Sequence, residues 1–364
     1  MFKPTFVLTP AITKALMEIE ACRQAVLRLP LSAPMLDSLR RTARLLSTHF
    51  STQIEGNKLS SSQVEEVLEG GGRFPGRERD EAEVRQYYKA LEFVMEQSAR
   101  KEPLNERLVR VIHGLVMSGR KTPTTYRDGQ NVIRDGRTGR MVYLPPVAKD
   151  APALMKDLMA WIAEEMKQGE LPVPVIAGLV HYQFATIHPY YDGNGRTARL
   201  LATCILHQGG YGLHGIYSLE EYYAQHLQGY YDALAVGASH NYYEGRMEAD
   251  VTPFLTYFSM GMAESFTKIR SQAEKERNEP DQTVLLRELS PQQRKALSLF
   301  ARIKIVSSGD IAKFFRITTR SASALCLKWV DVGFLMIADP SKKAWRYQLT
   351  EKNEKLVAAR QQEK

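Results

Sequence analysis

The segment from residue 176 to residue 207 constrains the fold of this chain most. Apolar residues at helical spacing predict a helix that ends at His188, because Pro189 disfavours helical geometry in the residue before it. A second apolar helix is predicted from Arg196 to His207. The residues between them are rich in glycine, so successive backbone N–H groups can turn toward an anion at the start of the second helix.

Arg196 and Arg199 place two cations in the first turn of that second helix. Each opposes the helix dipole, at about 0.3–1 kcal/mol when exposed, and the two guanidinium groups repel each other. A bound polyphosphate offsets both the unfavourable helix-dipole energy and the repulsion, because it accepts hydrogen bonds from the N–H groups and from both side chains. Asp192 could then hold a divalent cation that bridges phosphate oxygens. The alternative is a plain helix–helix turn with two solvated arginines and His188 as a helix C-cap.

The rest of the first 287 residues favours helices and one β-hairpin. Residues 36–54 form an amphipathic helical pattern, and Gly56 can end this helix in a left-handed conformation. Strand-like residues at 131–134 and 140–144 flank a turn that contains glycine, which predicts a hairpin. Helical patterns fill most of the remainder.

The last fifth of the chain predicts a separate basic unit. Residues 288–364 contain 15 Lys and Arg against 7 Asp and Glu, whereas residues 1–287 contain 34 of each kind. The whole net charge of +8 therefore lies in this part, which favours an acidic partner there. Three short helices and a hairpin with a basic turn follow the order of a winged helix-turn-helix domain, at 290–302, 308–315, 318–332 and 334–349.

Composition favours a soluble globular protein, with 44% hydrophobic and 25% charged residues. We find no run of 18 apolar, uncharged residues, so no membrane span is predicted. The N-terminus lacks the apolar run of a secretory signal. The isolated cysteines Cys22, Cys204 and Cys326 favour neither a disulfide framework nor a zinc cluster, so we expect a cytoplasmic protein.

The twelve residues from His188 to Arg199 resemble the signature of the Fic family, in the Fic/Doc superfamily. They match the pattern His-Pro-Phe-x-Asp/Glu-Gly-Asn-Gly-Arg-x-x-Arg with one departure, Tyr190 in place of phenylalanine. That position is a core anchor in the family, so the added hydroxyl needs a partner. The resemblance runs from about residue 30 to 265. It implies a mainly α fold, a Fic-type helical bundle with a β-hairpin flap, joined here to a small C-terminal winged helix-turn-helix domain.

On this resemblance we expect five segments. They are an N-terminal helical region (1–110) with an inhibitory motif at 51–56, a Fic catalytic core (111–275) with a flap at 126–146, a linker (276–287), a winged-helix-like domain (288–350) and a polar tail (351–364).

The resemblance implies a protein adenylyltransferase, which transfers AMP from ATP to a Ser, Thr or Tyr hydroxyl of a target protein and releases pyrophosphate. His188 would be the general base, and Asp192 would bind Mg²⁺ or Mn²⁺. The glycine-rich backbone would hold the α- and β-phosphates, and the two arginines the β- and γ-phosphates. The implied nucleotide-binding residues are Asp192, Gly193, Asn194, Gly195, Arg196, Thr197, Ala198 and Arg199, with Val142 and Tyr143 earlier in the chain and Tyr230 later.

A second motif, Ser51-Thr52-Gln53-Ile54-Glu55-Gly56, resembles the family's inhibitory pattern Ser/Thr-x-x-x-Glu-Gly/Asn. Its matching positions are Ser51, Glu55 and Gly56. Glu55 falls at a helix C-terminus and Arg199 at a helix N-terminus, where each charge is disfavoured, so a pair between them relieves both defects. The resemblance implies that Glu55 then occupies the arginine that the γ-phosphate needs. The alternative is a solvated glutamate beside a C-cap glycine.

The resemblance also implies partners. The target's backbone would dock along the flap as an added strand, and the target could be the chain itself. Relatives often form dimers, and the winged-helix-like domain would suit nucleic acid or protein. Two other functions stay open: a Fic-type enzyme that uses another phosphate substrate or removes AMP, and a nucleotide-sensing DNA-binding regulator. Tyr230 and Tyr231 could also be an ordinary aromatic pair in the core.

Overall fold

The computed structural model describes residues 2–100, 102–134, 138–237, 239–278, 289–338 and 345–362. The chain divides into two compact units, Met1–Arg277 and Asn278–Lys364, called here the first and the second unit. Helix α11 (Thr252–Asn278) continues into the segment predicted to begin a linker at 276. Its last residues, Lys275-Glu276-Arg277, are good helix formers, which explains why the helix does not stop earlier.

The first unit is almost entirely helical, which confirms the mainly α fold class. Its longer helices are α1 (Pro10–Leu27), α2 (Ala33–Ile54), α4 (Glu78–Ala99), α5 (Glu106–Ser118), α6 (Ala151–Gln168), α7 (Val173–Ile187), α8 (Asn194–Gln208) and α11. The shorter ones include α3 (Ser61–Glu65), α9 (Glu220–Gln225) and α10 (Leu227–Leu234).

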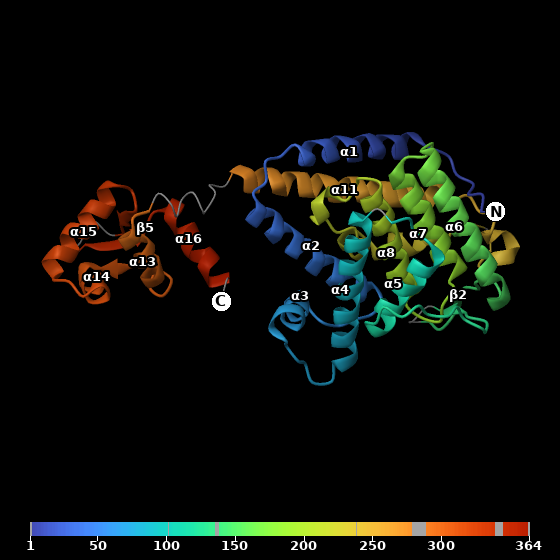
Figure 1. Cartoon of the computed structure of the whole chain (residues 1–364), viewed down its shortest axis with the longest axis horizontal. Helices are drawn as coiled ribbons and strands as arrows, with labels where there is room; N and C mark the ends of the chain where they lie inside the picture. Colours follow the sequence, from blue (N-terminus) through green and yellow to red (C-terminus); the bar gives the residue numbers. More distant parts are fainter. Residues whose placement is uncertain are drawn as a thin grey trace. The chain divides into compact units, whose positions relative to one another are not determined.

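Helices α7 and α8 lie at the centre of the first unit, with α2 and α4 on one side and α6 on the other (Figure 1). Nearly every side chain of α7 is buried. Gly178 allows this close packing, because a Cβ there would lie only 2.9 Å from Leu255 of α11. The turn between α7 and α8 is therefore held by two helices that the core fixes in place.

Helix α2 begins earlier than the pattern at 36–54 predicted. The side chain of Ser32 accepts a hydrogen bond from the N–H of Met35 and so caps its first turn. At the other end Glu55 is the C-cap, and Gly56 has φ of 96°, a conformation that a side chain would strain. The predicted glycine stop is thus confirmed, and it leaves Glu55 at the very end of the helix.

The predicted hairpin forms from β1 (Ile133–Arg134) and β2 (Met141–Tyr143), which pair in antiparallel fashion. Residues 135–137 of its turn lie outside the described residues. After β2 the chain stays tied to the bundle, because Leu144 N–H donates to His240 O and Leu144 O accepts from Tyr242 N–H.

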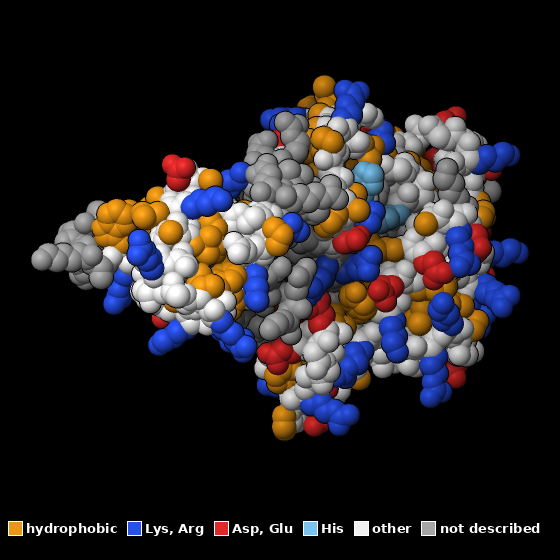
Figure 2. Space-filling view, turned by 60° about the vertical axis from the view of Figure 1, so that its left-hand side comes forward, with side chains coloured by type: hydrophobic (Ala, Val, Ile, Leu, Met, Phe, Trp, Pro, Cys, Tyr) orange, Lys and Arg blue, Asp and Glu red, His pale blue; other side chains and the backbone are white. Residues whose placement is uncertain are grey.

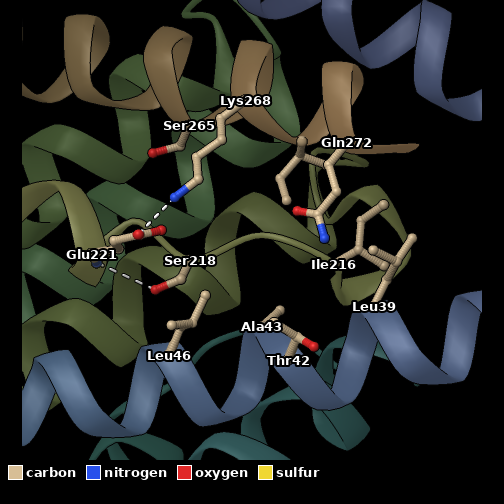
Figure 3. A pocket seen from close by; sticks show the side chains of 11 residues that line it. Leu39, Thr42, Ala43, Leu46, Ile216, Ser218, Glu221, Ser265, Lys268 and Gln272 are labelled. Carbon is tan, nitrogen blue, oxygen red and sulfur yellow. Dashed lines mark hydrogen bonds and ion pairs between the residues drawn. The ribbon is translucent and has the colours of Figure 1, made fainter. Parts of the chain in front are cut away.

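A cavity of about 30 Å³ lies between α2 and α11 (Figure 3). Leu39 and Leu46 of α2 line one wall, and Lys268 reaches across from α11 to Glu221, 2.6 Å away. Its volume suits one or two water molecules, so it is not a candidate nucleotide site.

The second unit contains α13 (Pro291–Phe300), β3 (Val306–Ser307), α14 (Ser308–Phe315), α15 (Thr319–Asp331), β4 (Leu335–Ile337), β5 (Arg346–Leu349) and α16 (Glu351–Gln362). Strand β5 lies between β3 and β4 in an antiparallel sheet. These are the elements of the predicted winged helix, and that assignment stays a prediction. The basic turn at 339–343 lies outside the described residues.

Most of the predicted polar tail at 351–364 is helical, because residues up to Gln362 form α16. Leu356 and Val357 of this helix are buried in the core of the second unit, beside residues such as Leu297 and Trp329. Two adjacent apolar residues among charged ones give no helical period, so the sequence pattern did not reveal the helix. Among the described residues, no helix combines the length and apolar character needed to cross a membrane.

Candidate nucleotide site at the start of helix α8

The loop before α8 exposes unpaired backbone donors. Gly193 has φ of 76°, which turns the chain into the helix that begins at Asn194. The buried side chain of Asn194 holds this loop, since its Oδ1 accepts from Tyr190 N–H at 3.0 Å and its Nδ2 donates to Tyr190 O at 2.8 Å. The N–H groups of Asn194, Gly195 and Arg196 have no acceptor within the described part of the chain. We call these three N–H groups the anion cradle.

His188 ends α7 in a left-handed conformation, with φ of 49° and ψ of 58°. Its Nδ1 lies 3.3 Å from the carbonyl oxygen of Ala185. A carbonyl can only accept, so Nδ1 carries the proton and Nε2 keeps its lone pair. Burial lowers the pKa of His188 to about 4, which leaves the imidazole neutral at pH 7. A neutral ring with a free Nε2 can take a proton.

Arg199 is fully buried and pairs with Glu55. Its Nη2 donates to Glu55 Oε1 at 2.9 Å and to Ser51 O at 2.9 Å, and its Nε donates to Ser51 Oγ at 2.8 Å. Burial alone would lower the pKa of Arg199, but the Glu55 carboxylate, together with Tyr230 and Tyr87, raises it overall. The predicted contact between Glu55 and Arg199 is therefore present, and Ser51 takes part in it. The inhibitory role of this contact stays a prediction.

The Glu55 carboxylate lies against the anion cradle. A Cβ added at Gly195 would collide with Glu55 Oε1 and would lie 3.3 Å from Arg199 Nη1. Nη1 is itself buried and without a hydrogen-bond partner in the described residues. The carboxylate thus occupies the place where a ligand's anionic group would meet both the helix N-terminus and Arg199.

Asp192 has one carboxylate oxygen to spare. Its Oδ1 accepts from Gly193 N–H at 2.6 Å and from Arg196 Nη2 at 3.1 Å. Oδ2 has no donor within the described part of the chain, and the side chain is 53% exposed. The described residues contain no cluster of three or more His, Cys, Asp or Glu that could hold a metal by themselves. The single carboxylate of Asp192 fits Mg²⁺, which is usually bound by one or two carboxylates together with substrate phosphates.

Comparisons with known proteins find that this chain is similar to Fic proteins. Residues 103–206 match the Fic/DOC family model. The chain contains a Fic/DOC family domain. Two curated relatives bear the name "Protein adenylyltransferase Fic". The one from Drosophila ananassae is 26% identical over 202 residues, covering 54% of this chain and 39% of its own. The one from Aedes aegypti is 28% identical over 230 residues, covering 62% and 41%. The chain thus spans about two fifths of the length of these relatives.

Solved structures share the fold. A Fic family protein from Desulfovibrio desulfuricans aligns with a TM-score of 0.69 at 23% identity, over 96% of this chain and 99% of its own. A Fic domain containing signaling protein from Bacteroides thetaiotaomicron gives 0.60 at 24% identity, over 73% and 97%. The first alignment includes most of the second unit as well as the Fic domain.

Three residues around the Fic signature were missed by the sequence analysis. Arg127 is buried and donates from Nε to His188 O at 2.9 Å, from Nη1 to Gly129 O at 3.1 Å, and from Nη2 to Pro146 O. It joins the turn that carries the histidine to both ends of the flap segment. A single arginine in a loop carries no pattern, so no local signal could have revealed it.

His113 of α5 is the second of these residues. Its Nε2 donates to Asp192 O at 2.9 Å, and its ring stacks on Tyr190 with centroids 3.5 Å apart. Burial raises the pKa of Tyr190 to about 12, and its buried hydroxyl has no hydrogen-bond partner in the described residues. The tyrosine ring thus packs in the core position where the Fic signature has phenylalanine, but among the described residues its hydroxyl lacks the partner that the sequence analysis expected.

Glu83 of α4 is the third. Its carboxylate pairs with Arg196, whose other ion pair is with Asp192. The predicted phosphate contact of Arg196 would therefore use the donors that these two carboxylates leave free.

Four other residues implied by the Fic resemblance differ in exposure, because Thr197, Ala198 and Tyr143 are buried and Val142 is exposed. Thr197 and Ala198 are fully buried within α8, and the N–H of Thr197 donates to Gly193 O inside the helix. Tyr143 of the flap is 5% exposed, and its hydroxyl donates to Thr186 O at 2.7 Å, so it anchors the flap in the core. Val142 is 39% exposed and free to meet a partner.

The aromatic pair on α10 is divided between core and surface. Tyr230 is 2% exposed, and its hydroxyl lies 2.8 Å from His181 Nε2. Tyr231 is 46% exposed, and its hydroxyl donates to Ile54 O at 3.4 Å, next to Glu55. The Fic resemblance implies an aromatic pair that lines the adenine pocket, with Tyr230 the better contact of the two. Its burial instead favours Tyr231 as the ring available for stacking.

Proposed function

We propose that this chain is a protein adenylyltransferase that transfers AMP from ATP to a Ser, Thr or Tyr hydroxyl of a target protein, and that Glu55 holds it in an inhibited state. The observation that carries the proposal is the Glu55 carboxylate lying against the anion cradle and paired with buried Arg199. The Fic/DOC domain and the names of the curated relatives support the same activity.

The reaction needs a base, and the neutral ring of His188 supports that role for it. Its Nε2 lone pair takes the proton of the target hydroxyl while the hydroxyl oxygen attacks the α-phosphorus of ATP. The bond from the α-phosphorus to the bridging oxygen breaks, and pyrophosphate leaves with the electron pair. AMP stays on the target through a new phosphoester bond.

The cradle and the arginines position the phosphates and neutralise their charge, which is most of what a reaction at phosphorus requires. The N–H groups of Asn194, Gly195 and Arg196 hold the α- and β-phosphate oxygens. Arg199 receives the γ-phosphate once Glu55 has moved away. Asp192 would hold a magnesium ion, which would offset the negative charge of the phosphates.

Glu55 inhibits by competing with the nucleotide for Arg199. With the carboxylate in place, the γ-phosphate cannot reach the guanidinium, and ATP binds with its α-phosphorus turned away from His188. The target approaches along the flap, where Met141 and Val142 are exposed and Tyr143 fixes the strand to the core.

The test is transfer of label from α-labelled ATP with magnesium, for the wild type and Glu55→Gly, with a cell lysate as the source of targets. We expect Glu55→Gly to label protein at least about tenfold faster, because the buried cation it frees binds phosphate instead. Without nucleotide the same variant should melt at a lower temperature, since the orphaned Arg199 costs up to about 3 kcal/mol.

Labelling outcomes also separate the alternatives. Equal labelling by both proteins at saturating ATP would remove the inhibitory role of Glu55. Label from γ-labelled but not α-labelled ATP would indicate a different transferred group. Loss of AMP from a modified protein would indicate the reverse reaction.

A second function, nucleic-acid binding by the second unit, is favoured by one observation. Lys and Arg outnumber Asp and Glu on the visible face of this unit (Figure 2). Arg320 and Lys328 are exposed on α15, which has no acidic residue before Asp331. Binding of the full chain to duplex DNA that weakens steeply with salt, and weakens again in Arg320→Ala, would support it. Binding that neither salt nor the substitution changes would contradict it.

A further inference from the structure

Arg196 is held by two carboxylates at once. Its side chain is 6% exposed, its Nη1 pairs with Glu83 of α4, and its Nη2 pairs with Asp192 at 3.1 Å. Two of its five N–H donors are thereby used, and the buried Nε has no partner in the described residues. The guanidinium is fixed in one orientation, with donors still available for an anion.

Glu83 is itself fixed from the other side. Its second oxygen, Oε2, accepts from Nδ2 of Asn57 at 2.9 Å, and the same Nδ2 donates to Asp80 O at 3.0 Å. Oδ1 of Asn57 accepts from Leu59 N–H at 3.1 Å. Asn57 is 6% exposed and follows Glu55 by two residues, so the turn after α2 is bonded directly to the partner of Arg196.

The turn at residues 55–57 therefore reaches both arginines of the Fic signature. Glu55 contacts Arg199 directly, and Asn57 contacts Arg196 through Glu83. The two routes differ in kind. Glu55 occupies the cradle and must leave before a phosphate can enter, whereas Glu83 approaches from α4, and its second oxygen is already held by Asn57.

Burial also favours a lasting pair between Glu83 and Arg196. The side chain of Glu83 is 15% exposed, compared with 28% for Glu55. Burial raises the pKa of Glu83, while Arg196 and Asn57 act against the rise. Separating the pair would leave two poorly solvated charges, so ATP gains more by adding to the free donors of Arg196 than by displacing Glu83.

We propose that Glu83 is a positioning residue for the nucleotide, which fixes Arg196 beside the anion cradle and, through Asn57, ties it to the turn that carries Glu55. This inference rests on the proposed function, and it concerns an acid that supports phosphate binding, the opposite of the role proposed for Glu55. Removing Glu83 should therefore weaken ATP binding even when Glu55 is absent.

The test measures binding of a non-hydrolysable ATP analogue with magnesium, in full-length protein that carries Glu55→Gly so that Arg199 is free. Adding Glu83→Gln should weaken binding and raise KM for ATP by about tenfold, the usual effect of losing a hydrogen bond between charged groups. The value of kcat at saturating ATP should change less than about twofold. Asn57→Ala should act in the same direction with a smaller effect, and Glu83→Asp should restore part of the loss.

The matched control is Glu81→Gln on the same helix. Glu81 is also buried and paired, with Arg85 at 3.2 Å, and it accepts from Phe74 N–H, away from the cradle. Glu81→Gln should lower the melting temperature of the protein without changing its affinity for ATP. Equal ATP affinity in Glu83→Gln and Glu81→Gln would overturn the role of Glu83 and leave the proposed function standing. No ATP binding by Glu55→Gly alone would overturn the proposed function, and this inference with it.

Discussion

At the scale of single residues, His188 can act in catalysis without taking part in ATP binding. The ring donates from Nδ1 to Ala185 O and keeps Nε2 free, while the phosphate donors belong to other residues. His188→Ala should therefore reduce labelling by at least about 10²-fold, the contribution expected of a general base. Affinity for the ATP analogue should stay within about twofold, because the cradle and both arginines remain.

The exposed His226 provides the control for this prediction. His226→Ala should leave both labelling and ATP affinity unchanged. Labelling by His188→Ala at the wild-type rate would show that another group takes the proton.

The residues of the site fall into two classes by how far the sequence could predict them. His188, Asp192 and Arg199 lie within one loop and one helical turn, so charge placement and spacing alone indicated an anion site. Arg127, Glu83 and His113 reach the same site from three other parts of the chain. Each is an ordinary polar residue in its own segment, and only the packing of α4, α5 and the flap against α8 gives it a role.

At the scale of elements, one buried hydroxyl helps to anchor the flap. Tyr143 donates to Thr186 O at 2.7 Å, and the guanidinium of Arg246 lies 4.8 Å from the centre of its ring. Tyr143→Phe should lower the free energy of unfolding by about 0.5–1.5 kcal/mol in urea titration, the usual value of one hydrogen bond. The affinity for ATP should not change, because the hydroxyl faces α7. A clear loss of ATP affinity at unchanged stability would restore the nucleotide contact that the resemblance implied.

Elements with a long period or a strong stop were predictable, and so was the hairpin of β1 and β2 with glycine in its turn, whereas β3 was not. Helix α2 was indicated by its amphipathic pattern and by Gly56. Strand β3, at Val306–Ser307, is too short to show alternation, and it forms because β5 offers it an edge. An element can be predicted when the pattern that determines it lies in its own sequence, as for α2, and not when a neighbouring strand determines it, as for β3.

At the scale of the whole molecule, the eight histidines are distributed unevenly. All of them precede residue 241, so the second unit has none. Burial lowers the pKa of His113, His188 and His207 to about 4, and that of His181 to about 3. These four rings are neutral in the folded first unit, whereas in the unfolded chain they titrate near 6.5.

The two units should therefore respond differently to mild acid. Between pH 6.5 and about 4 the unfolded first unit binds more protons than the folded one, so its stability falls as the pH is lowered through this window. Each fully buried histidine contributes at most about 1.4 kcal/mol per pH unit. Calorimetry of the full chain at pH 7.5 and pH 5.5 should show the transition of the first unit moving to lower temperature. The transition temperature of the second unit should stay the same, since that unit has no histidine, the side chain that ordinarily titrates between pH 5.5 and 7.5. Equal shifts of both transitions, or a shift of the second alone, would show that buried histidines do not control the response.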